Sequence, residues 1–144
     1  MNKLLLAVLL SALSIGCTSE CPNVWTELGT TVGNNANNDL RAPFSQHVQD
    51  TIYALDGRNF IDGRAGDDEL YGGSGHDNIK GSDDEDYIVG GRGRDYLFGG
   101  PHADVIEAAD GWKDEVNCGS GDKDKASVDK VDSVSRCEFV SRGG

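Results

Sequence analysis

Five tandem copies of a nine-residue unit occupy residues 63–107, and each copy has an aspartate at its sixth place. The copies read GRAGDDELY, GGSGHDNIK, GSDDEDYIV, GGRGRDYLF and GGPHADVIE, and a weaker copy, ALDGRNFID, precedes them at 54–62. The eighth place is always Ile or Leu, and the sixth place holds in order Asn59, Asp68, Asp77, Asp86, Asp95 and Asp104. A fixed short period indicates a stacked repeat architecture, in which each unit depends on its neighbours for its core.

Each unit combines a turn with a short strand. Glycine permits positive φ, so the first places of the unit can form a tight turn. In the extended last places, side chains alternate between two faces, and the eighth place points inward. Two units then complete one coil of a flattened parallel helix. The sequence therefore predicts an all-β fold, a parallel β-roll (a right-handed β-solenoid) of about three coils.

The period places acidic groups in rows along both edges of such a roll. Asp68, Asp86 and Asp104 fall on one edge, and Asn59, Asp77 and Asp95 fall on the other. Carboxylates about 5 Å apart repel by about 3 kcal/mol at an effective dielectric constant of about 20. A hard divalent cation between the turns reverses this effect. Oxygen donors without His or Cys in the recurrent places favour calcium over zinc or copper.

The rows resemble the hemolysin-type (RTX) calcium-binding nonapeptide, Gly-Gly-x-Gly-x-Asp-x-apolar-x, over residues 54–107 and more loosely over 108–126. The cysteine-bearing tail is similar to the ends of small secreted bacterial members. The resemblance implies calcium between successive turns, held by aspartates and by carbonyl groups of the glycine turns. The matching positions are Asp68, Asp77, Asp86, Asp95, Asp104, the neutral Asn59, and the turn residues Gly66, Gly75, Asp84 and Gly93. Asp114 and Asp124 match after one residue is inserted in each of their units.

Some turns depart from the family pattern. Asp84 and His102 stand where the third glycine is usual, and Arg64 and Ser82 replace the second. Asp can adopt the left-handed conformation, so Asp84 can keep its turn and add a ligand. His102 predicts a distorted turn in the last copy, where it is expected to be a strained but tolerated turn residue; a role as a metal ligand is the alternative. The best-formed calcium site is therefore expected between the turns of Asp77 and Asp95.

The N-terminus reads as an export signal over residues 1–16. A short basic start precedes an apolar run of about a dozen residues, which is too short for a membrane span. The end of the run, LSIGC, resembles a lipobox, in which Cys17 is lipidated; ordinary cleavage before Cys17 is the alternative. Residues 17–50 are expected to form a tether, 51–117 the roll, and 118–144 a degenerate repeat with a C-terminal cap. The expected location is extracellular, with membrane contact only through a lipid on Cys17.

Four cysteines agree with an oxidising compartment. Cys118 and Cys137 fit no paired CxxC zinc pattern and are expected to form a disulfide that closes the tail. Cys17 and Cys21 can pair only if Cys17 carries no lipid.

Charge and motifs restrict the function further. The net charge of −12, from 25 acidic and 13 basic residues, argues against binding nucleic acid. There is no HExxH or GxSxG motif, so no enzymatic activity is predicted. The favoured interpretation is an exported, non-enzymatic calcium-binding protein whose folding is coupled to calcium.

Two alternatives remain open from the sequence. One is an adhesion or targeting module for a surface polymer or protein, supported by an outward strip that includes Tyr71, Tyr87, Val89 and Val105. The other is an accessory module of a separate secreted enzyme. The sequence does not identify a protein or polysaccharide partner.

Overall fold

The computed structural model describes residues 25–27, 29–42 and 48–143, in which the regular elements are all β-strands. None of the described residues forms a helix long and apolar enough to cross a membrane. The predicted signal segment, the lipidation site Cys17 and Cys21 lie outside the described residues.

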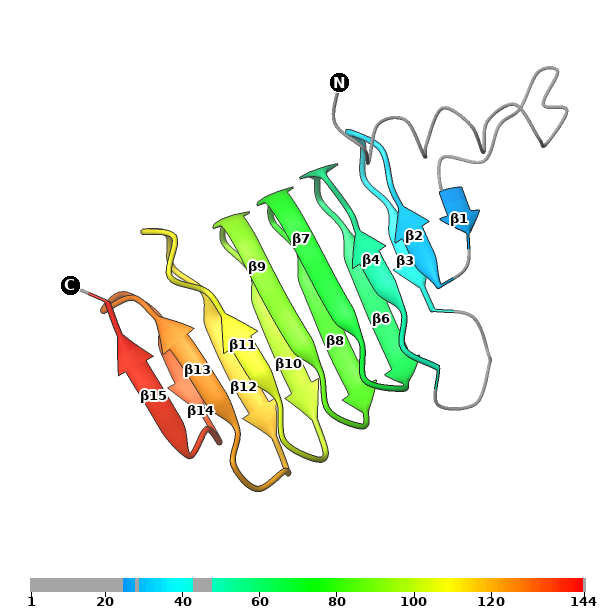
Figure 1. Ribbon diagram of the computed structural model, residues 1–144. Helices are drawn as coiled ribbons and strands as arrows, with labels where there is room; N and C mark the ends of the chain where they lie inside the picture. The colour runs from blue at the N-terminus through cyan, green and yellow to red at the C-terminus, as the bar shows by residue number, and fades with distance from the viewer. Residues whose placement is uncertain (1–24, 28, 43–47, 144) are drawn as a thin grey trace, which may run out of the picture.

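The strands form two sheets that lie face to face, with coils stacked from β2 and β3 to β14 and β15 (Figure 1). The larger sheet has nine strands. In spatial order these are β1 (Trp25–Glu27), β2 (Thr30–Val32), β4 (Thr51–Tyr53), β7 (Glu69–Gly75), β9 (Tyr87–Gly93), β11 (Val105–Glu107), β13 (Lys125–Val128) and β15 (Phe139–Arg142), with β5 (Asp56–Gly57) also paired to β7. The smaller sheet has six: β14 (Ser133–Ser135), β12 (Glu115–Gly119), β10 (Tyr96–Gly100), β8 (Asn78–Asp83), β6 (Phe60–Ala65) and β3 (Asp39–Arg41).

The strand register confirms that two nine-residue units make one coil. Leu70 pairs with Ile88 in the larger sheet, and Ile61 pairs with Ile79 in the smaller one. The strands pair in parallel throughout the described roll, except that β1 is antiparallel to β2. Later coils are longer, because Leu97 pairs with Val116 and Ile106 with Ala126. These longer coils contain the two insertions expected from the sequence.

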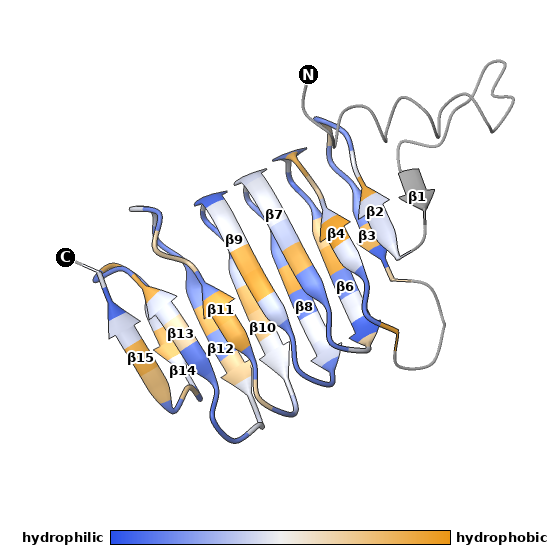
Figure 2. Cartoon of the chain, viewed as in Figure 1, coloured by the Kyte–Doolittle hydropathy of each residue, from blue (hydrophilic) through white to orange (hydrophobic). Residues whose placement is uncertain are grey.

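The core is a single layer of apolar side chains from the eighth place of each unit. It forms an apolar band across the middle of the strands (Figure 2). Ile52, Ile61, Leu70, Ile79, Ile88 and Ile106 are completely buried. Each such side chain contributes about 2 kcal/mol through burial. Because this layer is thin, the turns at both edges also carry a large share of the stabilising interactions.

The predicted number of coils is wrong: six strands stack in the smaller sheet, in place of about three coils. The roll extends beyond the glycine-rich copies in both directions. At the N-terminal end, β2 and β3 lie within residues 17–50, where a tether was expected. At the C-terminal end, β13 and β15 continue the stacking through the segment expected to form a cap. These coils keep the inward apolar residue and the row hydrogen bonds of Asp50 and Asp132 without the full glycine turn.

The disulfide between Cys118 and Cys137 is present, as predicted. Cys118 is completely buried, and Cys137 packs against the core from the last coil. The bond therefore fastens the end of the roll to the preceding coil.

Replacing both cysteines, Cys118→Ser with Cys137→Ser, should lower the free energy of unfolding by about 3 kcal/mol, because the bond closes a loop with a sequence separation of 19 residues. Urea denaturation in saturating calcium measures the change. Reduction of the unmodified protein is the control and should produce a similar loss. Equal stability of the oxidised protein and the double variant would contradict the stabilising role.

Candidate metal centre

A continuous row of hydrogen bonds runs along each edge of the roll. In each row, the sixth-place side chain accepts a hydrogen bond from the backbone amide of the sixth-place residue one coil earlier. On the first edge, Asp68, Asp86, Asp104 and Asp124 accept from the amides of Asp50, Asp68, Asp86 and Asp104 at 2.8, 3.0, 2.9 and 2.8 Å. On the second, Asn59, Asp77, Asp95, Asp114 and Asp132 accept from Asn38, Asn59, Asp77, Asp95 and Asp114 at 3.0, 2.8, 2.8, 2.8 and 2.9 Å.

These rows bring the predicted aspartates together as expected, on two separate edges. They also include residues that the sequence analysis missed or placed only loosely. Asn38, Asp50 and Asp132 extend the rows, and Glu138 accepts a hydrogen bond from the Asp124 amide at 2.9 Å. The signal that could have revealed them is a polar residue two places before the inward apolar residue, as in Asp50-Thr-Ile and Asp132-Ser-Val.

The second carboxylate oxygen of seven buried row aspartates has no hydrogen-bond partner. Among the described residues, this is true of Oδ2 in Asp68, Asp77, Asp86, Asp95, Asp104, Asp114 and Asp124. A buried polar atom without a partner costs about 1–3 kcal/mol, and more when it is charged. Because this cost is repeated in successive coils, it indicates that a cation interacts with the carboxylate at each turn.

The first glycine of each unit leaves space beside this oxygen. A Cβ atom on Gly72 would lie 2.7 Å from Asp77 Oδ2 and 2.4 Å from the carbonyl oxygen of Gly90 in the next coil. Gly63 has the same arrangement, with Asp68 Oδ2 at 2.6 Å and the Gly81 carbonyl oxygen at 2.7 Å from the added atom. A carboxylate oxygen and a carbonyl oxygen therefore converge on a space that any side chain would fill.

The fourth place brings further carbonyl groups close to the next coil. Gly75 and Gly93 have φ of 144° and 133°, which disfavours residues with a side chain. A Cβ atom on Gly93 would lie 1.6 Å from the Gly75 carbonyl oxygen. Glycine at this place on the second edge therefore allows the turns to stack closely, with carbonyl oxygens directed between coils.

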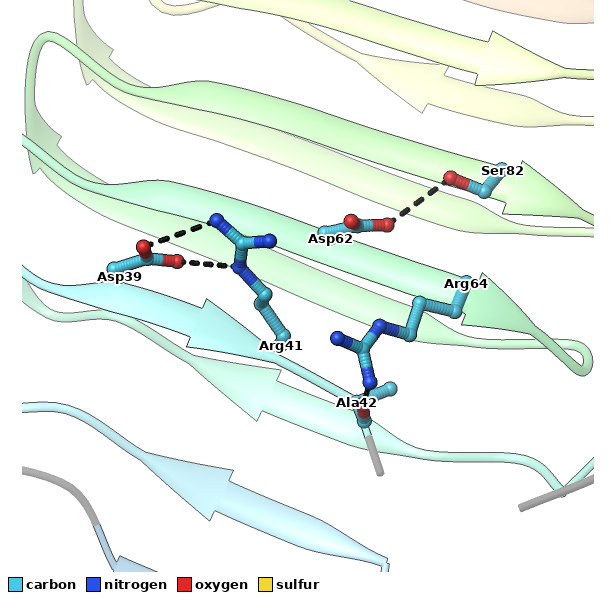
Figure 3. Close-up of polar contacts among 6 residues, drawn as sticks. All are labelled: Asp39, Arg41, Ala42, Asp62, Arg64 and Ser82. Atoms are coloured by element: carbon cyan, nitrogen blue, oxygen red, sulfur yellow. Dashed lines mark hydrogen bonds and ion pairs between the residues drawn. The ribbon is translucent and has the colours of Figure 1, made fainter. Parts of the chain in front are cut away.

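The two residues that replace the second glycine use their side chains to connect coils. Arg64 and Ser82 have φ of 77° and 89°, so they adopt the left-handed conformation that the turn requires. Arg64 Nη1 donates to the Ala42 carbonyl oxygen at 2.7 Å, and Ser82 Oγ donates to Asp62 Oδ1 at 3.2 Å (Figure 3). These contacts offset part of the backbone strain, which is about 1–2 kcal/mol at each residue.

Asp84 and His102 also keep the turn conformation, each with φ of 78°. Asp84 therefore adopts the left-handed conformation expected from its sequence. Its Oδ2 atom accepts a hydrogen bond from the Gly66 amide at 3.1 Å. The turn at His102 forms despite the disturbance expected there, and its carbonyl oxygen approaches Gly121 of the next coil.

Burial raises the pKa values of the row carboxyls. Desolvation is the largest cause, and it raises the pKa of Asp86 to about 8 from an ordinary value of 3.8. The neighbouring charges of Asp104 and Asp68 add to this rise, whereas the hydrogen bond from the Asp68 amide lowers the pKa. Desolvation likewise raises the pKa values of Asp68, Asp95, Asp104 and Asp114 to about 7. Without a cation, these carboxyls therefore bind protons at a higher pH than exposed carboxyls do.

The donor set fits calcium. Within the described residues, no three Asp, Glu, His or Cys side chains converge as a metal-binding group. A cation at these turns therefore has to be bound by backbone carbonyl oxygens together with the carboxylates. Calcium accepts six to eight oxygen ligands in irregular shells that include carbonyl groups. The unpaired Oδ2 atoms and the glycine-lined spaces provide donors of this type.

Comparison with protein families finds a match to the RTX calcium-binding nonapeptide repeat (4 copies) at residues 49–79 and 80–111. Searches of curated proteins and of solved structures find no match.

Protons and calcium should compete for the same carboxylates. Five row aspartates have pKa values of about 7 to 8 in the folded state and 3.8 when unfolded, so the folded state binds more protons between these values. They are Asp68, Asp86, Asp95, Asp104 and Asp114. Their contribution to stability is fully present below the unfolded pKa and is lost as the pH rises through the folded pKa. Metal-stripped protein should therefore have a higher melting temperature at about pH 5 than at about pH 8, and the absence of an unfolding transition at about pH 8 counts as the same result.

Thermal unfolding followed by circular dichroism tests this prediction. The same measurement in saturating calcium is the control, and there the melting temperature should rise with pH, because deprotonation favours the bound cation. If the melting temperature of the metal-stripped protein rises from pH 5 to pH 8, the row carboxyls do not bind protons preferentially in the folded state.

Proposed function

We propose that this chain, which matches the RTX calcium-binding nonapeptide repeat at residues 49–79 and 80–111, is an exported, non-enzymatic protein that folds when it binds calcium. The observation that carries the proposal is the repeated unpaired Oδ2 atom beside a glycine-lined space in successive coils. Nonapeptide repeats of this family are calcium-binding motifs.

The proposed ligands are the row aspartates together with carbonyl groups of the turns. Asp68, Asp86 and Asp104, with Asp84, serve the first edge, and Asp77 and Asp95 serve the second, where Asn59 forms a weaker first site. Gly66, Gly75 and Gly93 provide the turn geometry through which carbonyl oxygens approach the neighbouring coil. Calcium supplies a double positive charge and a shell of oxygen ligands.

The protein's own groups explain why folding and binding are coupled. Each Oδ1 atom already accepts an amide hydrogen bond from the preceding coil, so a carboxylate reaches its position only when two coils are stacked. A preformed site therefore does not exist in the unfolded chain, and the free energy of binding contributes to folding. Without calcium, repulsion and desolvation of the rows oppose stacking.

Export is supported by two independent features. The disulfide Cys118–Cys137 is characteristic of an oxidising compartment. The apolar run that ends before Cys17 has the length of a signal segment, and Cys17 itself is the proposed lipidation site when the signal is of the lipoprotein type. At the higher calcium concentrations outside cells, an exported chain meets its ion only after secretion.

A calcium titration of the metal-stripped protein at neutral pH tests the central claim. The β-strand signal in circular dichroism should rise cooperatively with calcium, fall again on addition of EDTA, and respond little to magnesium, which requires a smaller octahedral shell. A fully formed roll in EDTA at neutral pH would reject the coupling of folding to calcium.

Asp95→Asn should weaken calcium binding on the second edge by on the order of tenfold or more, because one carboxylate charge is lost. The amide oxygen of the new side chain can still accept the hydrogen bond from the Asp77 amide, so the row itself is retained. Glu115→Gln is the matched control, since it removes one exposed charge from β12, outside the turns. Isothermal titration calorimetry provides the measurement, and equal affinities of the two variants would contradict the assignment of Asp95.

Asn59→Asp tests the same assignment in the opposite direction. Asn59 occupies a sixth place, and its Nδ2 atom is buried without a partner, as are the Oδ2 atoms of the aspartates. The substitution should raise calcium affinity or add one bound ion per chain, while lowering stability in metal-free buffer at pH 8. Isothermal titration calorimetry measures the number of bound calcium ions and their affinity in both proteins. Equal values in the two proteins would contradict the prediction.

A further inference from the structure

The two edges of the roll differ in exposed charge. On the second edge, the fifth place of successive turns holds Arg58, His76, Arg94 and Lys113, all exposed, and Arg92 lies in the same row of turns. We call these five residues the basic turn edge. On the first edge, the fifth places hold the exposed Asp67 and Glu85, then Ala103 and the exposed Lys123, and Asp83 is also exposed in these turns. A chain with a net charge of −12 therefore concentrates cationic groups along one line.

The cationic groups of this edge are available to a ligand. Within the described residues, the ion pair between Arg41 and Asp39 lies on β3 and involves none of them. Asp110 shares these turns, but its two carboxylate oxygens accept hydrogen bonds from the Gly93 and Trp112 amides at 3.0 and 2.8 Å. Asp56 is exposed in the first of the turns and forms no ion pair with the edge.

Two surface hollows with aromatic walls flank His76. One includes Arg58, Phe60 and Tyr96, and the other includes Arg92 and Trp112. Tyr96 and Trp112 are 45% and 58% exposed, which is high for large aromatic side chains. His76 Nδ1 lies 3.2 Å from the Arg94 amide nitrogen, so its ring stands between the two hollows and is held against the next coil.

We propose that the basic turn edge and its two aromatic hollows bind an anionic polysaccharide. Guanidinium groups bind carboxylate and sulfate groups through paired hydrogen bonds. Exposed aromatic rings pack against the apolar faces of sugar rings while their polar atoms remain in water. The proposal rests on the proposed function in that it requires a folded roll. Asn59 and Asp77 line one hollow and Gly75 and Gly93 line the other, so the polymer lies beside the calcium sites of this edge.

The spacing of the edge favours a chain polymer over a small anion. Equivalent residues in successive coils lie about 4.8 Å apart, so Arg58, His76, Arg94 and Lys113 form a row that runs along the roll. A polymer with an acidic group on its sugar units can meet one side chain per coil. A nucleic acid carries about one phosphate charge per 1.7 Å of duplex. This is a higher charge density than one acidic group per sugar unit, so the rest of the acidic surface repels nucleic acid more strongly. An acidic protein segment would not need two aromatic hollows.

The test uses the full chain in saturating calcium and the double variant Arg58→Ala with Arg94→Ala. The control variant, Lys125→Ala with Arg142→Ala, removes the same charge from β13 and β15 on the other sheet. Biolayer interferometry with immobilised polygalacturonate, dextran sulfate, neutral dextran and duplex DNA measures binding. Circular dichroism in calcium and in EDTA establishes that each variant still folds on binding calcium.

The proposal predicts binding to at least one of the two anionic polysaccharides, weaker binding to DNA, and none to neutral dextran. The double variant should lose about tenfold in affinity, and the control variant less than about twofold. Tyr96→Ala should also weaken polysaccharide binding, because one wall of a hollow is removed. The proposal is overturned if the folded protein binds neither polymer, if DNA binds as tightly, or if the control variant loses as much affinity as the double variant. These outcomes are separate from a failure of calcium-coupled folding, which circular dichroism reports directly.

Discussion

The fold depends on the hydrogen bond between a backbone amide and a carboxylate one coil further along the chain. This bond fixes the height of each coil and brings the aspartate under the turn, where only one of its oxygens is paired. The apolar core cannot replace it, because one layer of Ile and Leu side chains has no second layer behind it. Stacking therefore stabilises the roll and also buries carboxylate oxygens that have no hydrogen-bond partner. A cation at these oxygens would satisfy them.

The sequence predicted this arrangement wherever the period was complete. Asp77 and Asp95 share an edge because two nine-residue units form a coil, and the period alone determines that relation. The ends of the rows were missed for a physical reason. Asp50 and Asp132 precede an inward apolar residue but lack the glycine turn, and a strand can pair with an existing coil without that turn. The number of coils was underestimated because glycine was treated as the mark of a coil.

Residues that interrupt the pattern could not be interpreted from the sequence. His102 was expected to distort its turn as a strained but tolerated residue, and it adopts the same φ as Asp84. Arg64 contributes a hydrogen bond to the carbonyl group of Ala42 in the preceding coil, which a single-unit reading cannot reveal. In a stacked structure, the hydrogen-bond partner of a turn residue lies about two units away in the sequence. The contact that offsets the backbone strain can therefore be identified only from the stacked coils.

The nine-residue period also explains why the exposed residues of the two edges differ. The sixth and eighth places are buried, so their identity is restricted by the amide hydrogen bond and by the core. The fifth place faces solvent and is free to vary, and it holds Arg94 on one edge and Glu85 on the other. The repeated, buried places determine the fold and the ion, as they would in any roll of this type. What distinguishes this protein from other calcium-binding rolls must therefore lie in the exposed places, and the basic turn edge is where those places are most uniform.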